Sequence, residues 1–306
     1  MKERGPAGEL CRVMTRDRLE LQGFLVLPEG GGDTAALHVH GLDGNFYENR
    51  FIDHLARVYA RHGIGFLTFN NRGHDYVADL LHEAADGRSE YRQLGGMYER
   101  LADCVPDIEA WTGFLRGRGF KRFVLQGHSH GAIKATHYLR AARPGDVVAL
   151  VLLSPSDDLG LARQRLGTGF EPAVARAKAM VDRGQERELV PAGDFPYPTS
   201  AGTFLDTLGP GSLAGVFNLS RTDRREFPEL GSVSVPVFLA VGTKDETFVG
   251  TPADYVAAIR AAMRSAPSFE GSVVEGAPHN YLGRESVLAA ALDRWLAGVR
   301  PGGREA

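Results

Sequence analysis

The chain has 306 residues, of which 43% are hydrophobic and 24% are charged, and its formal net charge is -3 at pH 7. These values are ordinary for a globular protein with a sizeable core, and they give no reason to expect nucleic acid or an anionic membrane as a partner. The two cysteines, Cys11 and Cys104, lie far apart in the sequence, which argues against a disulfide framework or a thiolate zinc site.

The N-terminal residues read MKERGPAGELCRV and lack the apolar stretch of a secretion signal. No run of the sequence approaches the roughly 20 apolar residues that a membrane-spanning helix needs. We therefore expect a soluble cytoplasmic protein.

Extended and helical patterns alternate along most of the chain. In the first half we expect a β-hairpin or two successive strands at 9–29, a strand at 35–41, a helix at 46–63 and a strand at 64–71. After a polar loop we expect a helix at 101–119, a strand at 121–127, a helix at 132–143 and a strand at 146–155. In the last quarter we expect strands at 235–242 and 268–276 and helices at 251–266 and 285–300. Such alternation predicts a mostly parallel sheet with helices on both faces.

One segment interrupts this alternation, at residues 156–232. It contains helical fragments such as EPAVARAKAMVDRG and turns rich in proline and glycine such as FPYPTSAG. Connections of this length inside a compact domain are usually lids or binding loops. We therefore expect a core domain made of residues 1–155 and 233–306, with residues 156–232 inserted as a lid or cap over one edge of the sheet.

The sequence GHSHG at 127–131 fits the pattern G-x-S-x-G and lies directly between a predicted strand and a predicted helix. This is the position of a nucleophile elbow, where a strained turn exposes a serine hydroxyl and small residues let strand and helix approach. The start of the following helix offers backbone N–H groups to a developing oxyanion. The pattern indicates that Ser129 is a catalytic nucleophile.

With this motif in place, the chain resembles the α/β-hydrolase superfamily. The resemblance implies a mainly parallel eight-stranded sheet, with the catalytic residues in the chain order serine, acid, histidine. It implies an acid just after the strand VPVFLAVG, where Asp245 is preferred over Glu246, and a histidine after the last strand, which is His279. Some members carry the acid one strand earlier, so Asp157 and Asp158 remain alternatives.

The resemblance also implies the role of each residue. Ser129 attacks a carbonyl carbon, His279 is the general base, and Asp245 orients its imidazole. His40-Gly41 is similar to the His-Gly that precedes the first oxyanion residue, so the backbone N–H groups of Leu42 and His130 are the expected oxyanion donors.

Two His-x-His pairs could carry a metal site instead. The pairs His38/His40 and His128/His130 lie on neighbouring strands and could bring four imidazoles to a zinc ion, but the elbow breaks the strand geometry needed for this. We expect no metal, with His40 and His128 as hydrogen-bonding neighbours of the catalytic residues. Arg72, in a stretch similar to the family's Asp-x-Arg-Gly-x-Gly, is expected to be structural.

The leading hypothesis is therefore a serine hydrolase that cleaves a small-molecule carboxylic ester, or a lactone or thioester, through an acyl-enzyme without an organic cofactor. An acyltransferase or cyclase would use the same triad with another acceptor and remains an alternative. A third hypothesis is a catalytically inactive hydrolase fold that binds a ligand, against which the intact triad argues. The sequence leaves the acyl group, the leaving group and the oligomeric state open.

Overall fold

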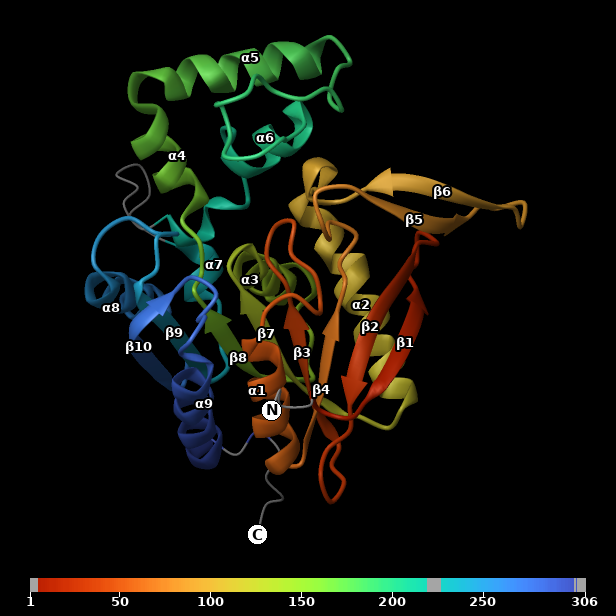
Figure 1. The fold of residues 1–306 in the computed structure, drawn as a ribbon, viewed down its shortest axis with the longest axis vertical. Helices are drawn as coiled ribbons and strands as arrows, with labels where there is room; N and C mark the ends of the chain where they lie inside the picture. The colour runs from red at the N-terminus through yellow and green to blue at the C-terminus, as the bar shows by residue number, and fades with distance from the viewer. Residues whose placement is uncertain (1–4, 219–226, 300, 302–306) are drawn as a thin grey trace.

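The computed structural model describes residues 5–218, 227–299 and 301. Its centre is an eight-stranded sheet with the strand order β1-β2-β4-β3-β7-β8-β9-β10 (Figure 1). These strands are β1 (Glu9–Met14), β2 (Glu20–Val26), β3 (Thr34–Val39), β4 (Ile64–Phe69), β7 (Arg122–His128), β8 (Val147–Leu153), β9 (Val237–Lys244) and β10 (Phe269–Pro278). The pairs β1·β2 and β2·β4 are antiparallel and all other neighbours are parallel, which confirms the predicted mainly parallel sheet.

Helices cover both faces of this sheet. On one face, α1 (Phe51–Arg61) and α9 (Glu285–Val299) share a hydrophobic cluster with the strands, and on the other face α2 (Cys104–Gly117), α3 (His130–Ala142) and α8 (Pro252–Ala262) do the same. Every residue of β3 and β4 is buried. Continuous burial is expected of strands covered on both faces, and it explains why these strands are apolar runs without alternation.

Helix α1 begins five residues later than the sequence pattern predicts. The side chain of Asn45 accepts a hydrogen bond from the backbone N–H of Tyr47 at 3.2 Å, and Asn70 Oδ1 accepts one from the N–H of Phe46 at 3.1 Å. These side chains hold residues 46–50 in bends and turns, so the helix starts at Phe51. The apolar spacing from Phe51 to Tyr59 was predicted correctly, but the polar start of the segment was not.

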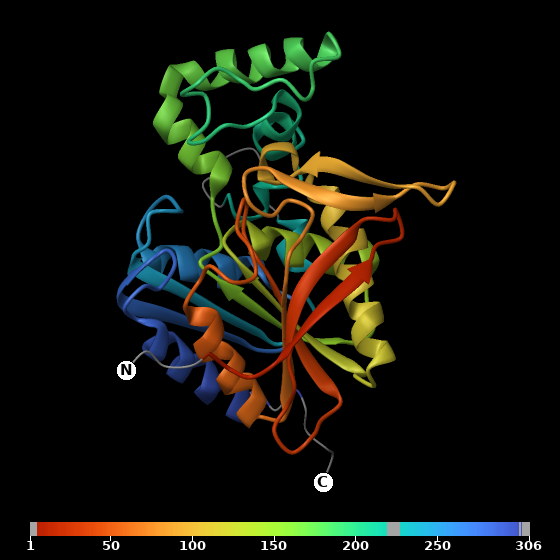
Figure 2. The same cartoon turned by 45° about the vertical axis from the view of Figure 1, so that its right-hand side comes forward.

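The polar loop expected after β4 contains a two-stranded hairpin instead. Strands β5 (Ala78–Glu83) and β6 (Ser89–Leu94) pair antiparallel and project beside the main sheet (Figure 2). The turn includes Asp86-Gly87, with Gly87 at φ 81°, and this pair is a hairpin signal. The expectation of a loop was wrong because β6 is exposed on both faces and so lacks apolar alternation.

Three helices lie above the carboxyl ends of the parallel strands: α4 (Asp158–Leu166), α5 (Phe170–Asp182) and α6 (Ala201–Leu208) (Figure 1). We call them the cap helices. They share a separate hydrophobic cluster that includes Phe170, Phe195 and Phe204. Val216 and Phe217 instead belong to the cluster that α2, α3 and α8 share with the sheet. A short helix, α7 (Pro228–Gly231), leads back to β9, and 3-10 turns lie at Gly96–Tyr98, Leu101–Asp103, Gly167–Gly169 and Gly215–Phe217. No helix within the described residues is long and apolar enough to cross a membrane.

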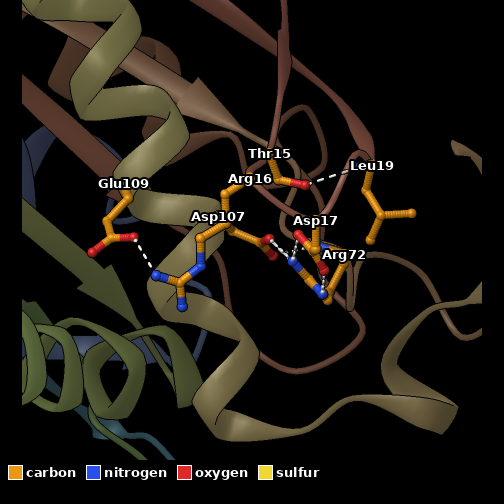
Figure 3. A network of polar contacts seen from close by, with 7 residues as sticks. All are labelled: Thr15, Arg16, Asp17, Leu19, Arg72, Asp107 and Glu109. Carbon is orange, nitrogen blue, oxygen red and sulfur yellow. Dashed lines mark hydrogen bonds and ion pairs between the residues drawn. The ribbon is translucent and has the colours of Figure 1, made fainter. Parts of the chain in front are cut away.

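Arg72 joins three segments that are distant in the sequence (Figure 3). Its guanidinium donates to Asp107 Oδ1 on α2 at 2.7 Å and to Asp17 Oδ2, in the turn between β1 and β2, at 2.7 Å. The backbone N–H of Arg72 also donates to Asp107 Oδ2 at 2.9 Å. The Asp107 side chain is fully buried and the Arg72 side chain nearly so, which makes this bidentate pairing part of the core. The network agrees with the structural role expected for Arg72.

Candidate active site

Ser129 occupies a strained turn between β7 and α3. Its backbone has φ 57° and ψ -130°, a conformation that residues with a side chain rarely adopt. A Cβ on Gly127 would lie 2.2 Å from the carbonyl oxygen of Gly131, and a Cβ on Gly131 would lie 2.1 Å from the carbonyl oxygen of Val39. Both flanking positions of the motif therefore require glycine, because strand, turn and helix pass at backbone contact.

Asp245 and His279 meet although 34 residues separate them in the sequence. Asp245 follows β9 and His279 follows β10, and because these strands are parallel neighbours, their carboxyl ends lie side by side. His279 Nδ1 lies 3.1 Å from Asp245 Oδ1, and the Asp245 side chain is fully buried. Burial opposes ionisation of Asp245, but the hydrogen bond and the charge of His279 outweigh it and hold the pKa of this carboxyl below its usual value.

Thr247 is a member of this cluster that the sequence did not reveal. Its hydroxyl donates to Asp245 Oδ1 at 2.8 Å and lies 3.0 Å from His279 Nδ1, and its backbone N–H donates to the same Asp245 oxygen at 3.1 Å. A carboxylate can only accept hydrogen bonds, so Nδ1 of His279 carries a proton and Nε2 is the nitrogen left free for other chemistry.

The two histidines beside Ser129 point to different partners. The ring of His128 lies 4.7 Å from the ring of His279, and His128 Nε2 donates to the backbone carbonyl of His279 at 3.0 Å. Burial lowers the pKa of His128 well below its usual value, so it is a neutral support for the His279 backbone. The ring of His130 turns toward the cap, where its Nδ1 lies 2.8 Å from Asp158 Oδ2.

The alternative acids have other roles. Asp158 contacts His130. Asp157 is the N-cap of α4, where its side chain accepts a hydrogen bond from the backbone N–H of Gly160 at 2.9 Å. Glu246 is exposed. Among the described residues, Asp245 is thus the acid that contacts the His279 ring.

His40 fixes the loop after β3 through hydrogen bonds to the backbone. The backbone N–H of Asn71 donates to His40 Nε2 at 2.9 Å, so the proton of the neutral ring is on Nδ1, which donates to the carbonyl of Gly41 at 2.7 Å. A trans peptide is planar, with C=O and N–H on opposite sides. Because the Gly41 carbonyl points into the core, the N–H of Leu42 points the other way. Gly41 itself abuts Ser129, since a Cβ there would lie 3.0 Å from Ser129 Cβ.

A buried ion pair supports the same carbonyl. Lys134 Nζ lies 2.6 Å from Glu99 Oε1 and donates to Gly41 O at 3.4 Å. The side chain of Lys134 is fully buried and that of Glu99 is 4% exposed. A buried lysine with two partners beneath this loop fixes the direction of the Gly41–Leu42 peptide. In the sequence it was a lone lysine in an apolar stretch of helix, which gave no indication of this contact.

Replacing Lys134 with methionine is expected to lower the free energy of unfolding by about 3–5 kcal/mol, because it leaves the Glu99 carboxylate buried without its cation. Adding Glu99→Gln should recover part of that loss. Urea unfolding measures both values. Lys178→Met is the control: Lys178 and Asp182 form an exposed pair on α5, so about 0.5 kcal/mol or less should be lost. An equal effect of the two lysine variants would contradict this account.

A cavity of about 610 Å³ opens at this edge of the sheet. Ser129, His279 and Thr247 line it from the core, and Leu161 and Tyr197 line it from the segment between β8 and β9. The loop after β3 contributes Leu42 and Asp43, and burial raises the pKa of the Asp43 carboxyl to about 6. The cavity therefore combines apolar side chains of the segment between β8 and β9, such as Leu161 and Phe195, with polar groups from the core and from α4.

The four histidines considered for zinc each have a partner in the protein. His38 Nδ1 accepts from Gln126 Nε2 at 2.8 Å inside the core, both nitrogens of His40 are used, and the other two bond to His279 and Asp158. Within the described part of the chain, no group of three or more histidine, cysteine, aspartate or glutamate side chains is arranged to hold a metal.

Comparison with known proteins identifies the family of the chain. A sequence model of the alpha/beta hydrolase family matches residues 36–291. The chain belongs to the alpha/beta hydrolase family. The order of Ser129, Asp245 and His279 along the chain, and their positions after β7, β9 and β10, agree with the order that the family implies.

Solved structures similar to this alpha/beta hydrolase include esterases, whereas no curated protein matches it. Est1E from Butyrivibrio proteoclasticus with bound ferulic acid is 17% identical, with a TM-score of 0.66 over 94% of this chain and 98% of that one. The Pyrococcus furiosus esterase Pf2001 is 19% identical, with a TM-score of 0.60 over 97% and 92%. Mouse alpha/beta hydrolase domain-containing protein 10 is 14% identical, with a TM-score of 0.62 over 95% and 99%. At these identities the likeness shows the fold alone.

Proposed function

We propose that this alpha/beta hydrolase cleaves a carboxylic ester, or a lactone or thioester, through an acyl-enzyme on Ser129. The observation that carries the proposal is that Ser129 and His279 line one cavity, with His279 hydrogen-bonded to Asp245. A serine on a strained turn and a histidine fixed by a buried carboxylate are the parts of a nucleophile–base pair. Two of the solved structures that share this fold are esterases.

In the first half of the proposed reaction, His279 Nε2 takes the proton of Ser129 Oγ while Oγ attacks the carbonyl carbon of the ester. The carbonyl oxygen becomes an oxyanion, which accepts hydrogen bonds from the N–H groups of Leu42 and His130. His279 then gives its proton to the leaving alcohol as the carbon–oxygen bond breaks. Asp245 stabilises the imidazolium that exists between these two transfers.

In the second half, His279 takes a proton from water, and the hydroxide attacks the acyl carbon. The tetrahedral intermediate collapses with return of the proton to Ser129 Oγ, and the carboxylic acid leaves. In this scheme α4 and residues 195–197 line the cavity opposite the core, and their apolar side chains, such as Leu161 and Phe195, receive the organic part of the substrate. The position of Leu42 supports this arrangement, since its side chain packs against the cap cluster.

Pre-steady-state hydrolysis of 4-nitrophenyl esters of graded chain length tests the proposal. We expect a burst of 4-nitrophenol of about one equivalent per active site, followed by slower steady turnover, because the good leaving group makes acylation faster than deacylation of the acyl-enzyme. A competing alcohol, included at rising concentration, reports how much of the acyl-enzyme goes to transfer. The proposal fails if the folded protein turns over none of the esters in the series.

A further inference from the structure

A second His–Asp pair, His130 and Asp158, lies in the same cavity, and its side chains have no part in the scheme above, which uses only the backbone N–H of His130. His130 Nδ1 and Asp158 Oδ2 are 2.8 Å apart, and the two side chains are 3% and 21% exposed. Both residues line the cavity together with Ser129. The pair also joins two parts of the molecule, because His130 is the first residue of α3 and Asp158 is the first residue of α4.

The pairing fixes which nitrogen of His130 carries the proton. The Asp158 carboxylate can only accept, so it holds the N–H on Nδ1, and in the neutral ring Nε2 is then a hydrogen-bond acceptor. Nε2 makes no hydrogen bond within the described residues. It is also not fully buried, unlike the unpaired polar atoms inside the core. It is therefore open to the cavity and available to a ligand.

The position of His130 indicates which part of the substrate it meets. His279 must reach the leaving group to return its proton, so the leaving group lies on the His279 side of Ser129. The ring of His130 instead faces α4, and the next cavity-lining residues on that helix are Leu161 and Ala162. An acyl group would lie along this wall, with its first carbons beside His130.

We infer that His130 Nε2 accepts a hydrogen bond from a hydroxyl group on the acyl chain, near the scissile carbonyl, so that esters of hydroxy acids are preferred substrates. This inference rests on the proposed function. The charged groups of the cavity favour a substrate that donates hydrogen bonds. Asp43, Glu48 and Asp158 are acceptors, whereas Arg165 donates to the carbonyls of Gly193 and Asp194 at 2.5 and 2.7 Å.

Matched esters test this assignment. We would measure kcat/KM for 4-nitrophenyl esters of 2-hydroxy- and 3-hydroxybutanoic acid, of their methoxy counterparts and of butanoic acid. Each value is divided by the rate of hydroxide hydrolysis of the same ester. The methoxy group keeps the oxygen but cannot donate. In the wild type, the normalised kcat/KM of at least one hydroxy ester should be about ten times that of its methoxy partner. This is the effect expected from one lost hydrogen bond.

Three variants and one control separate recognition from a structural role. His130→Phe keeps the backbone N–H and removes the acceptor, so the hydroxy-to-methoxy ratio should fall to about one. Asp158→Leu should lower the ratio because the ring loses its fixed proton position, and Asp158→Asn should restore most of it, since the amide oxygen can still accept from Nδ1. Asp182→Leu, at an exposed position on α5, should leave the ratio unchanged.

The ratio compares two substrates in one sample, so it does not depend on how much of a variant is folded. Wild-type ratios near one for both pairs, or a ratio that survives His130→Phe, would overturn the inference while leaving ester hydrolysis intact. Preference for the methoxy esters would also overturn it, because His130 would then act as a donor. Absence of turnover for every ester, butanoate included, would remove the proposed function and this inference with it.

Discussion

Replacing Ser129 with alanine is expected to lower kcat for ester hydrolysis by about 10⁶-fold, because no other group at the elbow can form the acyl-enzyme. The remaining rate would come from the oxyanion donors and from substrate binding alone. The substitution removes one oxygen and leaves the backbone of the turn in place, so the thermal unfolding midpoint should stay within a few degrees of the wild type. Steady-state hydrolysis of a 4-nitrophenyl ester measures the loss.

The control for this variant is Ser286→Ala, since Ser286 is exposed near the start of α9 and far from the elbow in the sequence. Its kcat should equal the wild-type value. Activity of Ser129→Ala above about one hundredth of the wild type would mean that another residue attacks the ester, because removal of a true nucleophile costs far more.

Replacing Asp245 with alanine is expected to lower kcat by about 10⁴-fold, with little change in KM. The imidazolium of His279 loses its buried counter-charge, and Nδ1 loses the acceptor that fixes its proton. Single-turnover hydrolysis measures the chemical step without product release. Asp157→Ala removes the N-cap of α4 and should lower the free energy of unfolding by about 1 kcal/mol. It should lower kcat far less than Asp245→Ala does, which distinguishes the two acids.

The structure predicts a milder effect for Asp245→Asn, of about 10²-fold. The backbone N–H of Thr247 donates to the Oδ1 position, so an asparagine should place its carbonyl oxygen there and leave the Nδ1 proton of His279 undisturbed. Only the charge is then lost. A loss as large as that of Asp245→Ala would show that the amide turns its NH₂ group toward His279 and shifts the proton to Nε2.

Much of the fold could be predicted from local patterns. Apolar runs such as β4 and β8, and the helical spacing of Phe51, Leu55 and Val58, identify elements whose burial is set by their own residues. Predicted boundaries were wrong where side chains captured backbone groups, as Asn45 does before α1. The hairpin β5–β6 was missed because its second strand is exposed and has no apolar pattern.

The candidate site was predictable to the extent that a motif marked it. The elbow around Ser129 has a sequence signature, and Asp245 and His279 follow from strand order. Thr247, the pair Lys134–Glu99 and the pair His130–Asp158 have no such signature. Each depends on side chains that meet only after strands and helices pack, so local sequence carries no trace of the contact. The tautomer of His40 is likewise set by the backbone of Asn71, from another strand end.

The central claim is that Ser129 becomes covalently attached to the acyl group. Peptide mapping by mass spectrometry after reaction with a fluorophosphonate probe tests it most directly, because the probe reacts with an activated serine and stays bound. We predict one adduct per chain, on the peptide that contains Ser129, and none in Ser129→Ala. An adduct on another residue, or labelling that persists in Ser129→Ala, would contradict the account.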